Sequence, residues 1–94
     1  MRKYELVVII NPDLEEKKTK ELIDKIKGWV EKENGKVVKL NQWGKKTLIY
    51  LIKKHQNGFY FLLELELEGT AAQKIEKKVK LEEEIIRYLM VRKD

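Results

Sequence analysis

The sequence predicts an α+β domain in which two helices cover one face of a four-stranded antiparallel sheet. Two stretches, residues 14–30 and 69–80, repeat apolar side chains at the period of a helix with one buried stripe. Four further runs are rich in β-branched and aromatic residues, as strands are. One of them ends in LELELE, residues 63–68, an alternation typical of a sheet with one buried face.

The first expected strand is KYELVVII, residues 3–10, which stops before the structure-breaking pair Asn11-Pro12. Asp13 is the expected cap of the helix that follows, because its carboxylate can accept hydrogen bonds from the free amides of a first turn. Glu15 and Glu16 lie in that turn, where the helix macrodipole favours negative charge.

The first helix is expected to bury one stripe and to end at Asn34-Gly35. Gly35 is the expected left-handed residue at that end, since glycine adopts this conformation at little cost. The inward side chains recur at helical spacing, with Trp29 beside them: Leu14, Leu22, Ile23, Ile26 and Val30.

The second strand, KVVKLNQWGKKTLIYLIKK at residues 36–54, is too long to run without interruption. We expect Gly44 to mark a bulge that bends the strand and changes which side chains face inward. The tripeptide Gln56-Asn57-Gly58 carries the Asn-Gly signal of a tight hairpin turn. The return strand is then FYFLLELELE, residues 59–68.

The chain closes with a second helix and a last strand. Gly69-Thr70 opens the helix, which runs to about Lys80 and turns Ala71 or Ala72, Ile75 and Val79 inward. The last strand is IIRYLMVRK, residues 85–93. The order β-α-β-β-α-β predicts the ferredoxin-like, or split βαβ, arrangement as a single domain over residues 1–94.

The alternation in the third strand decides which side chains face the helices. Three carboxylates turned toward the core would each cost several kcal/mol, so we expect Glu64 and Glu66 to be exposed. The inward residues are then Phe59, Phe61, Leu63 and Leu65. An RNA-recognition motif needs its aromatic side chains on the open face, so this class of RNA-binding domain is excluded.

The same alternation predicts the composition of the open face. It displays Lys3, Glu5, Val7, Ile9, Tyr60, Leu62, Glu64 and Glu66, with a part of Leu40, Leu48, Tyr50 and Ile52, depending on the bulge. Two interpretations stay open. A basic protein segment could bind there on an apolar seat of Val7, Ile9 and Leu62, or the face could be a solvated sheet with scattered apolar residues.

Composition excludes several function classes. Cysteine is absent and His55 is the single histidine, so we expect no disulfide, no thiol chemistry, no metal and no cofactor. The longest apolar runs are far shorter than the roughly 20 residues that span a bilayer, which predicts a soluble, cytosolic protein. Charged residues make up 39% of the chain and the net charge is +5, a balance that tolerates an anionic partner.

No catalytic constellation appears in the sequence. Acylphosphatases share this size and topology, but they need an Arg-bearing, Gly-rich loop after the first strand. This chain has the acidic stretch NPDLEE there, which does not cradle phosphate. The threonines lack a neighbouring base that would make a nucleophile. We therefore expect neither an enzyme nor a small-molecule substrate.

Four stretches together resemble the family of bacterial small-subunit ribosomal protein six. They are MRKYELVVIINPDL, GKVVKLNQWGKKTLIYLIKK, NGFYFLLELEL and LEEEIIRYLMV, in this order and spacing. The resemblance covers essentially the whole chain. It departs from the family's pattern at Ile49 and Leu51, where the family usually has Ala and Pro, and at Lys45 and Lys46, where arginine is often found.

The resemblance implies a structural RNA-binding role in the small ribosomal subunit. The family joins small-subunit ribosomal protein eighteen, and the pair binds the central domain of 16S rRNA. The implied RNA contacts, of which Arg87 is the strongest, are Arg2, Lys3, Lys45, Lys46, Lys53, Lys54, Arg87 and Arg92. The implied partner or stacking residues are Tyr4, Val7, Ile9, Trp43, Tyr50, Tyr60 and Leu62.

A second class of function remains open beside this one. Lysine and glutamate are used almost interchangeably over the expected surface, as in thermophile proteins or in sequences engineered on a known backbone. The alternative is therefore a ferredoxin-like scaffold that keeps the fold but no RNA function. Binding to the expected protein partner and rRNA discriminates the two.

Overall fold

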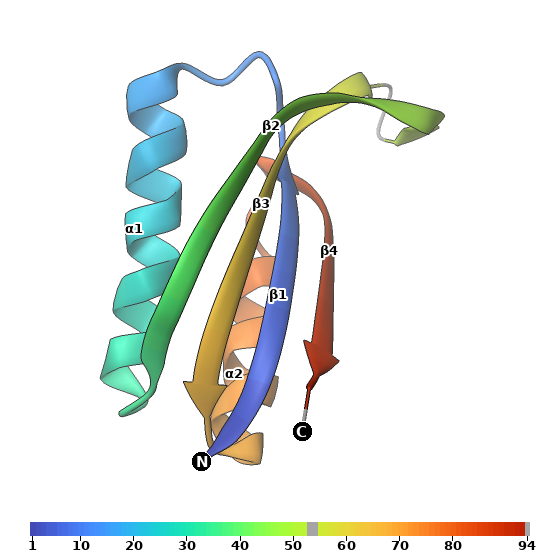
Figure 1. Ribbon diagram of the computed structural model, residues 1–94. Coiled ribbons are helices and arrows are strands. Elements are labelled where there is room, and N and C mark those ends of the chain that lie inside the picture. The colour runs from blue at the N-terminus through green and yellow to red at the C-terminus, as the bar shows by residue number, and fades with distance from the viewer. Residues whose placement is uncertain (53–54, 94) are drawn as a thin grey trace.

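The computed structural model describes residues 1–52 and 55–93, with side chains described outside residues 45–57. The predicted order is confirmed, and the elements are β1 (Arg2–Ile10), α1 (Glu16–Lys32), β2 (Lys36–Ile52), β3 (His55–Leu67), α2 (Gly69–Lys80) and β4 (Ile85–Arg92). Every strand pair is antiparallel and the strands lie in the order β2-β3-β1-β4 (Figure 1). In the described part of the chain, no helix is long and apolar enough to cross a membrane.

Both helices pack on one face of the sheet and leave the other face open (Figure 1). The core between the layers includes Ile26 and Val30 from α1 and Ile75 and Val79 from α2, all fully buried. Ala71 and Ala72 are both buried, so the whole predicted stripe of α2 faces the sheet.

The predicted parity of β3 is confirmed for its central residues. Phe61, Leu63 and Leu65 are at most 4% exposed and belong to the core. Phe59 packs against that core but is only half-buried, because it pairs with Ile10 at the end of β1. Glu64 and Glu66 lie on the open face as predicted. They are half-buried rather than exposed, because neighbouring strands flank both of them.

The two predicted end signals of α1 are corrected. The helix begins at Glu16 rather than after Asp13, whose amide instead donates to Asn11 Oδ1 at 2.9 Å in a local turn. At the other end the left-handed residue is Asn34, with φ 61°, and not Gly35. Asn34 N donates to Glu31 O and Gly35 N donates to Val30 O, which is the paired Schellman closure of a helix end.

The predicted hairpin turn at Gln56-Asn57-Gly58 is wrong. These residues lie inside β3, where Asn57 pairs with Thr47 and Gly58 pairs with Lys46. The two strands instead end at Ile52 and His55, which face each other. Packing rather than a turn explains the glycine at position 58, because a Cβ there would collide with Ile9 Cγ2.

The predicted bulge at Gly44 is confirmed. Gln42 pairs with Phe61 and Gly44 pairs with Tyr60, so Trp43 is the extra residue on β2. Gly44 has φ +80°, and Trp43 projects with 47% of its surface exposed. Beyond the bulge, β2 and β3 curve away together from the rest of the sheet (Figure 1).

We expect Gly44→Val to lower the free energy of unfolding by about 1–2 kcal/mol, measured by urea denaturation. The cost is backbone strain, because no atom lies within 4 Å of the new Cβ position. Gly44→Asn should lose much less, since asparagine tolerates a positive φ. Equal losses for the two variants would contradict strain as the cause.

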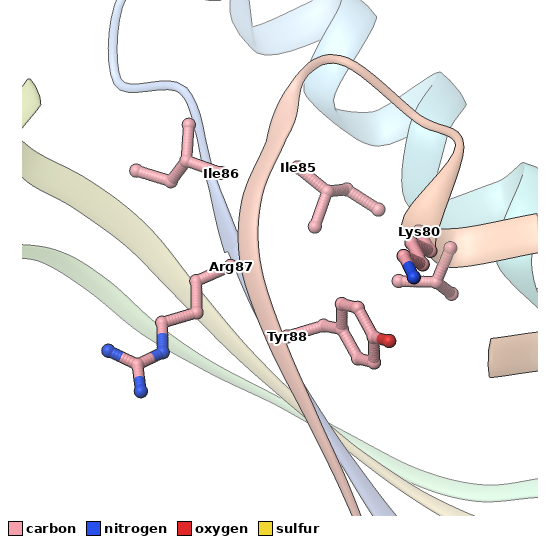
Figure 2. A pocket seen from close by; sticks show the side chains of 6 residues that line it. Lys80, Ile85, Ile86, Arg87 and Tyr88 are labelled. Carbon is pink, nitrogen blue, oxygen red and sulfur yellow. The ribbon is translucent and has the colours of Figure 1, made fainter. Parts of the chain in front are cut away.

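Strand β4 contains a bulge that the sequence did not signal. Ile9 pairs with Arg87 and Ile10 pairs with Ile85, so Ile86 is extra. As a result Ile86 and Arg87 project from one side of β4, while Ile85 and Tyr88 project from the other (Figure 2). The bulge therefore directs Arg87 away from the layer covered by the helices.

Candidate nucleic-acid and protein interface

The register of the sheet defines an apolar row across the open face. Val7 on the central strand β1 pairs with Leu62 on one side and with Leu89 on the other. Val7 and Leu62 are half-buried, whereas Leu89 is 58% exposed. Val91, two residues further along β4, is also exposed. These side chains form an apolar row across the open face, and two of them, Val7 and Leu62, belong to the expected apolar seat.

A second row beside it is acidic. Glu5 pairs with Glu64, so two carboxylates lie side by side on adjacent strands. Glu5 forms an ion pair of 3.0 Å with Lys93, and Lys39 on β2 stands opposite Glu64. This acidic row therefore lies beside the apolar row, and each of its two carboxylates has a lysine next to it.

The end of the open face nearest the β2 bulge is aromatic and basic. Tyr60 pairs with Ile9, and Ile9 pairs with Arg87 on the far side. The ring of Trp43 stacks on Tyr60, with 6.5 Å between centroids and 23° between planes. Arg87 is exposed at the edge strand. Together, Trp43, Tyr60 and Arg87 form what we call the basic-aromatic end.

Ile9 was predicted as part of an accessible apolar seat, and this prediction is corrected. Ile9 lies on the open face but is only 7% exposed, because Ile86 and Tyr60 pack against it. It therefore supports the basic-aromatic end from below rather than contacting a ligand. Leu40 is corrected too, since it packs against the core on the helix side and pairs with Leu63 there.

Three predicted contact residues lie at the opposite end of the sheet, near the chain termini. Arg2 pairs with Leu67 and Arg92 pairs with Tyr4, which places both on the helix-covered side. Lys3 is on the open face opposite Glu66. Tyr4 is half-buried, packs against the core and turns its hydroxyl toward Gly69, so its ring is engaged in packing. These residues do not meet Arg87.

Two further predicted basic residues, Lys45 and Lys46, have their backbones toward the basic-aromatic end. The backbone of Lys45 is opposite Phe59 and that of Lys46 is opposite Gly58 in the β2–β3 pairing. Their side chains, and those of Leu48, Tyr50 and Ile52, fall outside the described side chains. Lys53 and Lys54 fall outside the described residues altogether.

Sequence reasoning missed Leu89 and Val91, which extend the apolar row onto the edge strand. The available signal was their spacing from Arg87, because residues two apart in a strand share a face. The spacing alone did not show which face of the sheet Arg87 occupies, because the extra residue Ile86 reverses the alternation within β4.

The described side chains form no metal-binding cluster. No group of three or more His, Cys, Asp or Glu residues among them is arranged to hold a metal ion.

Comparison with known proteins gives consistent matches over the length of the chain. The family model described as Ribosomal protein S6 matches residues 3–92. The small ribosomal subunit protein bS6 of Heliobacterium modesticaldum is 46% identical over 94 residues, which are 100% of this chain and 98% of that protein. The protein of the same name from Moorella thermoacetica is 37% identical over 92 residues, covering 98% of this chain and 94% of that protein.

A solved structure shows the same architecture. The crystal structure of 30S ribosomal protein S6 from Thermotoga maritima superposes with a TM-score of 0.93 at 30% sequence identity. The match covers 98% of this chain and 87% of that chain.

Proposed function

Because this chain belongs to the ribosomal protein S6 family, and is thus a structural protein of the small ribosomal subunit rather than an enzyme, we propose that it binds the central domain of 16S rRNA together with small-subunit ribosomal protein eighteen. The observation that carries the proposal is the division of the open face. At one end of this face, Arg87 lies near the stacked rings of Trp43 and Tyr60. At its centre, the apolar row lies beside the carboxylates of the acidic row.

The basic-aromatic end supports the RNA part of the proposal. The Arg87 guanidinium offers a planar fork that binds a phosphate through two hydrogen bonds. Trp43 and Tyr60 already stack on each other, and the exposed part of Trp43 can accept an unpaired base. The neighbouring acidic row is a poorer site for a phosphate backbone, because Glu5 and Glu64 already use the charges of Lys93 and Lys39 beside them.

The apolar and acidic rows support the protein part. A segment that carries apolar side chains and Lys or Arg would cover Val7, Leu62 and Leu89 and place its cations near Glu5 and Glu64. Such complementarity favours association with a basic partner and disfavours acidic ones. Arg87 and the partner would then present one continuous positive surface to the rRNA.

Pull-down of purified ribosomal protein eighteen, with and without a central-domain rRNA fragment, tests the proposal. We expect retention of the partner, and stronger retention when the rRNA is present. If a well-folded sample retains neither partner nor rRNA, the proposal fails and the chain is a ferredoxin-like scaffold without RNA function.

Leu89→Lys should weaken binding of ribosomal protein eighteen about tenfold by calorimetry. Fully burying an exposed leucine contributes about 1.5–3 kcal/mol. Leu89 is 58% exposed, so the apolar contact that lysine would lose is worth roughly half of that, and tenfold corresponds to about 1.4 kcal/mol. Leu81→Lys is the matched control, since Leu81 is 81% exposed but follows α2, away from the open face. Equal weakening by both variants would reject the apolar row as the partner site.

A further inference from the structure

We propose that the groove between α2 and β4 binds single-stranded RNA, with a base stacked on Tyr88 and the neighbouring phosphates held by Lys77 and Lys80. This inference rests on the proposed RNA-binding function and adds a second contact surface to it. The groove consists of two adjoining hollows that share Lys80 and Tyr88. One measures about 240 Å³ and reaches Val79 and Ile85, and the other measures about 250 Å³ and reaches Gln73 and Lys77.

Tyr88 provides a supported aromatic surface in the floor of the groove. It is half-buried and packs against the core, so part of its side chain is supported and part is accessible. Figure 2 shows its ring on the same side of β4 as Ile85, with Lys80 at the end of α2 beside it. A base stacked on an aromatic side chain typically contributes about 1–3 kcal/mol.

The charge of the groove selects an anionic occupant. Lys77 and Lys80 are three residues apart on one side of α2, and neither forms an ion pair within the described part of the chain. Nearby lysines of the same helix are engaged, since Lys74 pairs with Glu33 at 3.2 Å and Lys78 lies 5.8 Å from the Trp29 ring. Among the described residues lining either hollow, Glu76 is the single carboxylate.

The groove is continuous with the basic-aromatic end through the edge of the sheet. Strand β4 is the last in the strand order, so no strand of the described residues pairs with its outer side. Arg87 projects from one side of β4 and Tyr88 from the other (Figure 2). An RNA strand whose phosphate contacts Arg87 can therefore pass around this edge and place its next nucleotides in the groove.

The test is an NMR titration of the free protein with the RNA octamer rA8 at low salt, following backbone and aromatic signals. An abasic ribose-phosphate octamer serves as a second ligand that has the charge without the bases. We expect shifts at Lys77, Lys80 and Tyr88 with rA8, and about tenfold weaker binding of the abasic strand. An octamer of aspartate tests whether the groove prefers an acidic protein segment.

Variants separate stacking from bulk charge. Tyr88→Leu should remove the preference for rA8 over the abasic strand, and Tyr88→Phe should keep it. Lys80→Gln should weaken both strands about threefold or more, whereas Lys17→Gln, an exposed position on α1, should change neither. Shifts confined to other surfaces, equal losses for Lys80→Gln and Lys17→Gln, or equal binding of the aspartate octamer would overturn the proposal.

The outcome is separable from that of the proposed function. The pull-down uses the open face, the protein partner and central-domain rRNA, whereas the titration uses the groove and a short strand without the partner. A successful pull-down with no shifts in the groove rejects the groove alone. Shifts in the groove with a failed pull-down leave a nucleic-acid site in a protein that lacks the proposed partner.

Discussion

Gly35→Ala is expected to lower the free energy of unfolding by about 2–3 kcal/mol, the largest effect we anticipate from a single methyl group. Gly35 follows α1 at the point where the chain turns into β2. An added Cβ would lie 2.8 Å from the carbonyl oxygen of Glu66 and 3.0 Å from Val30 Cγ1, and it would collide with Leu67 Cδ2.

The collision at Gly35 cannot be relieved cheaply. Leu67 and Val30 are fully buried, so their methyl groups have no free space to enter. The Glu66 oxygen belongs to the backbone of β3, and moving it would disturb the pairing with Lys36. Either the strand or the helix end must shift, and both options break packing in the core.

Gly28→Ala is the matched control. Gly28 lies within α1 and nothing stands within 4 Å of its Cβ position. Alanine there should raise stability by about 0.5–1 kcal/mol, because glycine disfavours the helical state. Urea denaturation of both variants measures the contrast, and a Gly35→Ala protein as stable as wild type would refute the close approach.

Gly35 also illustrates which parts of the fold the sequence could predict. Apolar periodicity located each helix and strand, because burial of one stripe or one face is a property of the element itself. The role of Gly35 depends on Leu67, a residue distant in sequence, so the local Asn34-Gly35 pattern assigned the left-handed conformation to the wrong member. The structure shows that Asn34 adopts the left-handed conformation that ends the helix. Gly35 lacks a side chain where β3 approaches its backbone closely.

The hairpin error has the same physical origin. Asn57-Gly58 carries a strong turn signal, but Gly58 is needed where Ile9 approaches the backbone of β3. Tertiary packing therefore competes with turn chemistry for the same residue type. The bulge at Gly44 was predictable because its long strand and local glycine both pointed to it.

The candidate site was predictable in part for a related reason. The alternation within β3 is regular, so it placed Leu62 and Glu64 on the open face. In β4 the extra residue Ile86 alters the alternation, and no glycine or proline in that strand indicates a bulge. The chemistry of Arg87 marks it as a candidate contact in the sequence, whereas the strand register shows that it shares a face with Tyr60 and Val7.

Arg87→Ala should weaken rRNA binding about tenfold when ribosomal protein eighteen is present. A charge-assisted, two-point contact to phosphate contributes about 1.5–3 kcal/mol, and tenfold corresponds to 1.4 kcal/mol. The log-log dependence of affinity on salt should also become shallower by about 0.7–0.9, because one phosphate contact is lost. Affinity measured over a salt series for wild type and variant gives both quantities.

Lys18→Ala is the appropriate control for bulk charge. Lys18 is exposed on α1, in the layer opposite the open face, and it forms no ion pair within the described residues. Lys25 would be a poor choice, because it pairs with Glu82 at 2.6 Å and lies 5.8 Å from the Trp29 ring. Removing Lys18 subtracts the same charge as removing Arg87, so any excess loss for Arg87→Ala measures its placement beside Tyr60 and Trp43. Equal losses would mean that the net charge of +5 accounts for the RNA affinity and that Arg87 is not a specific contact.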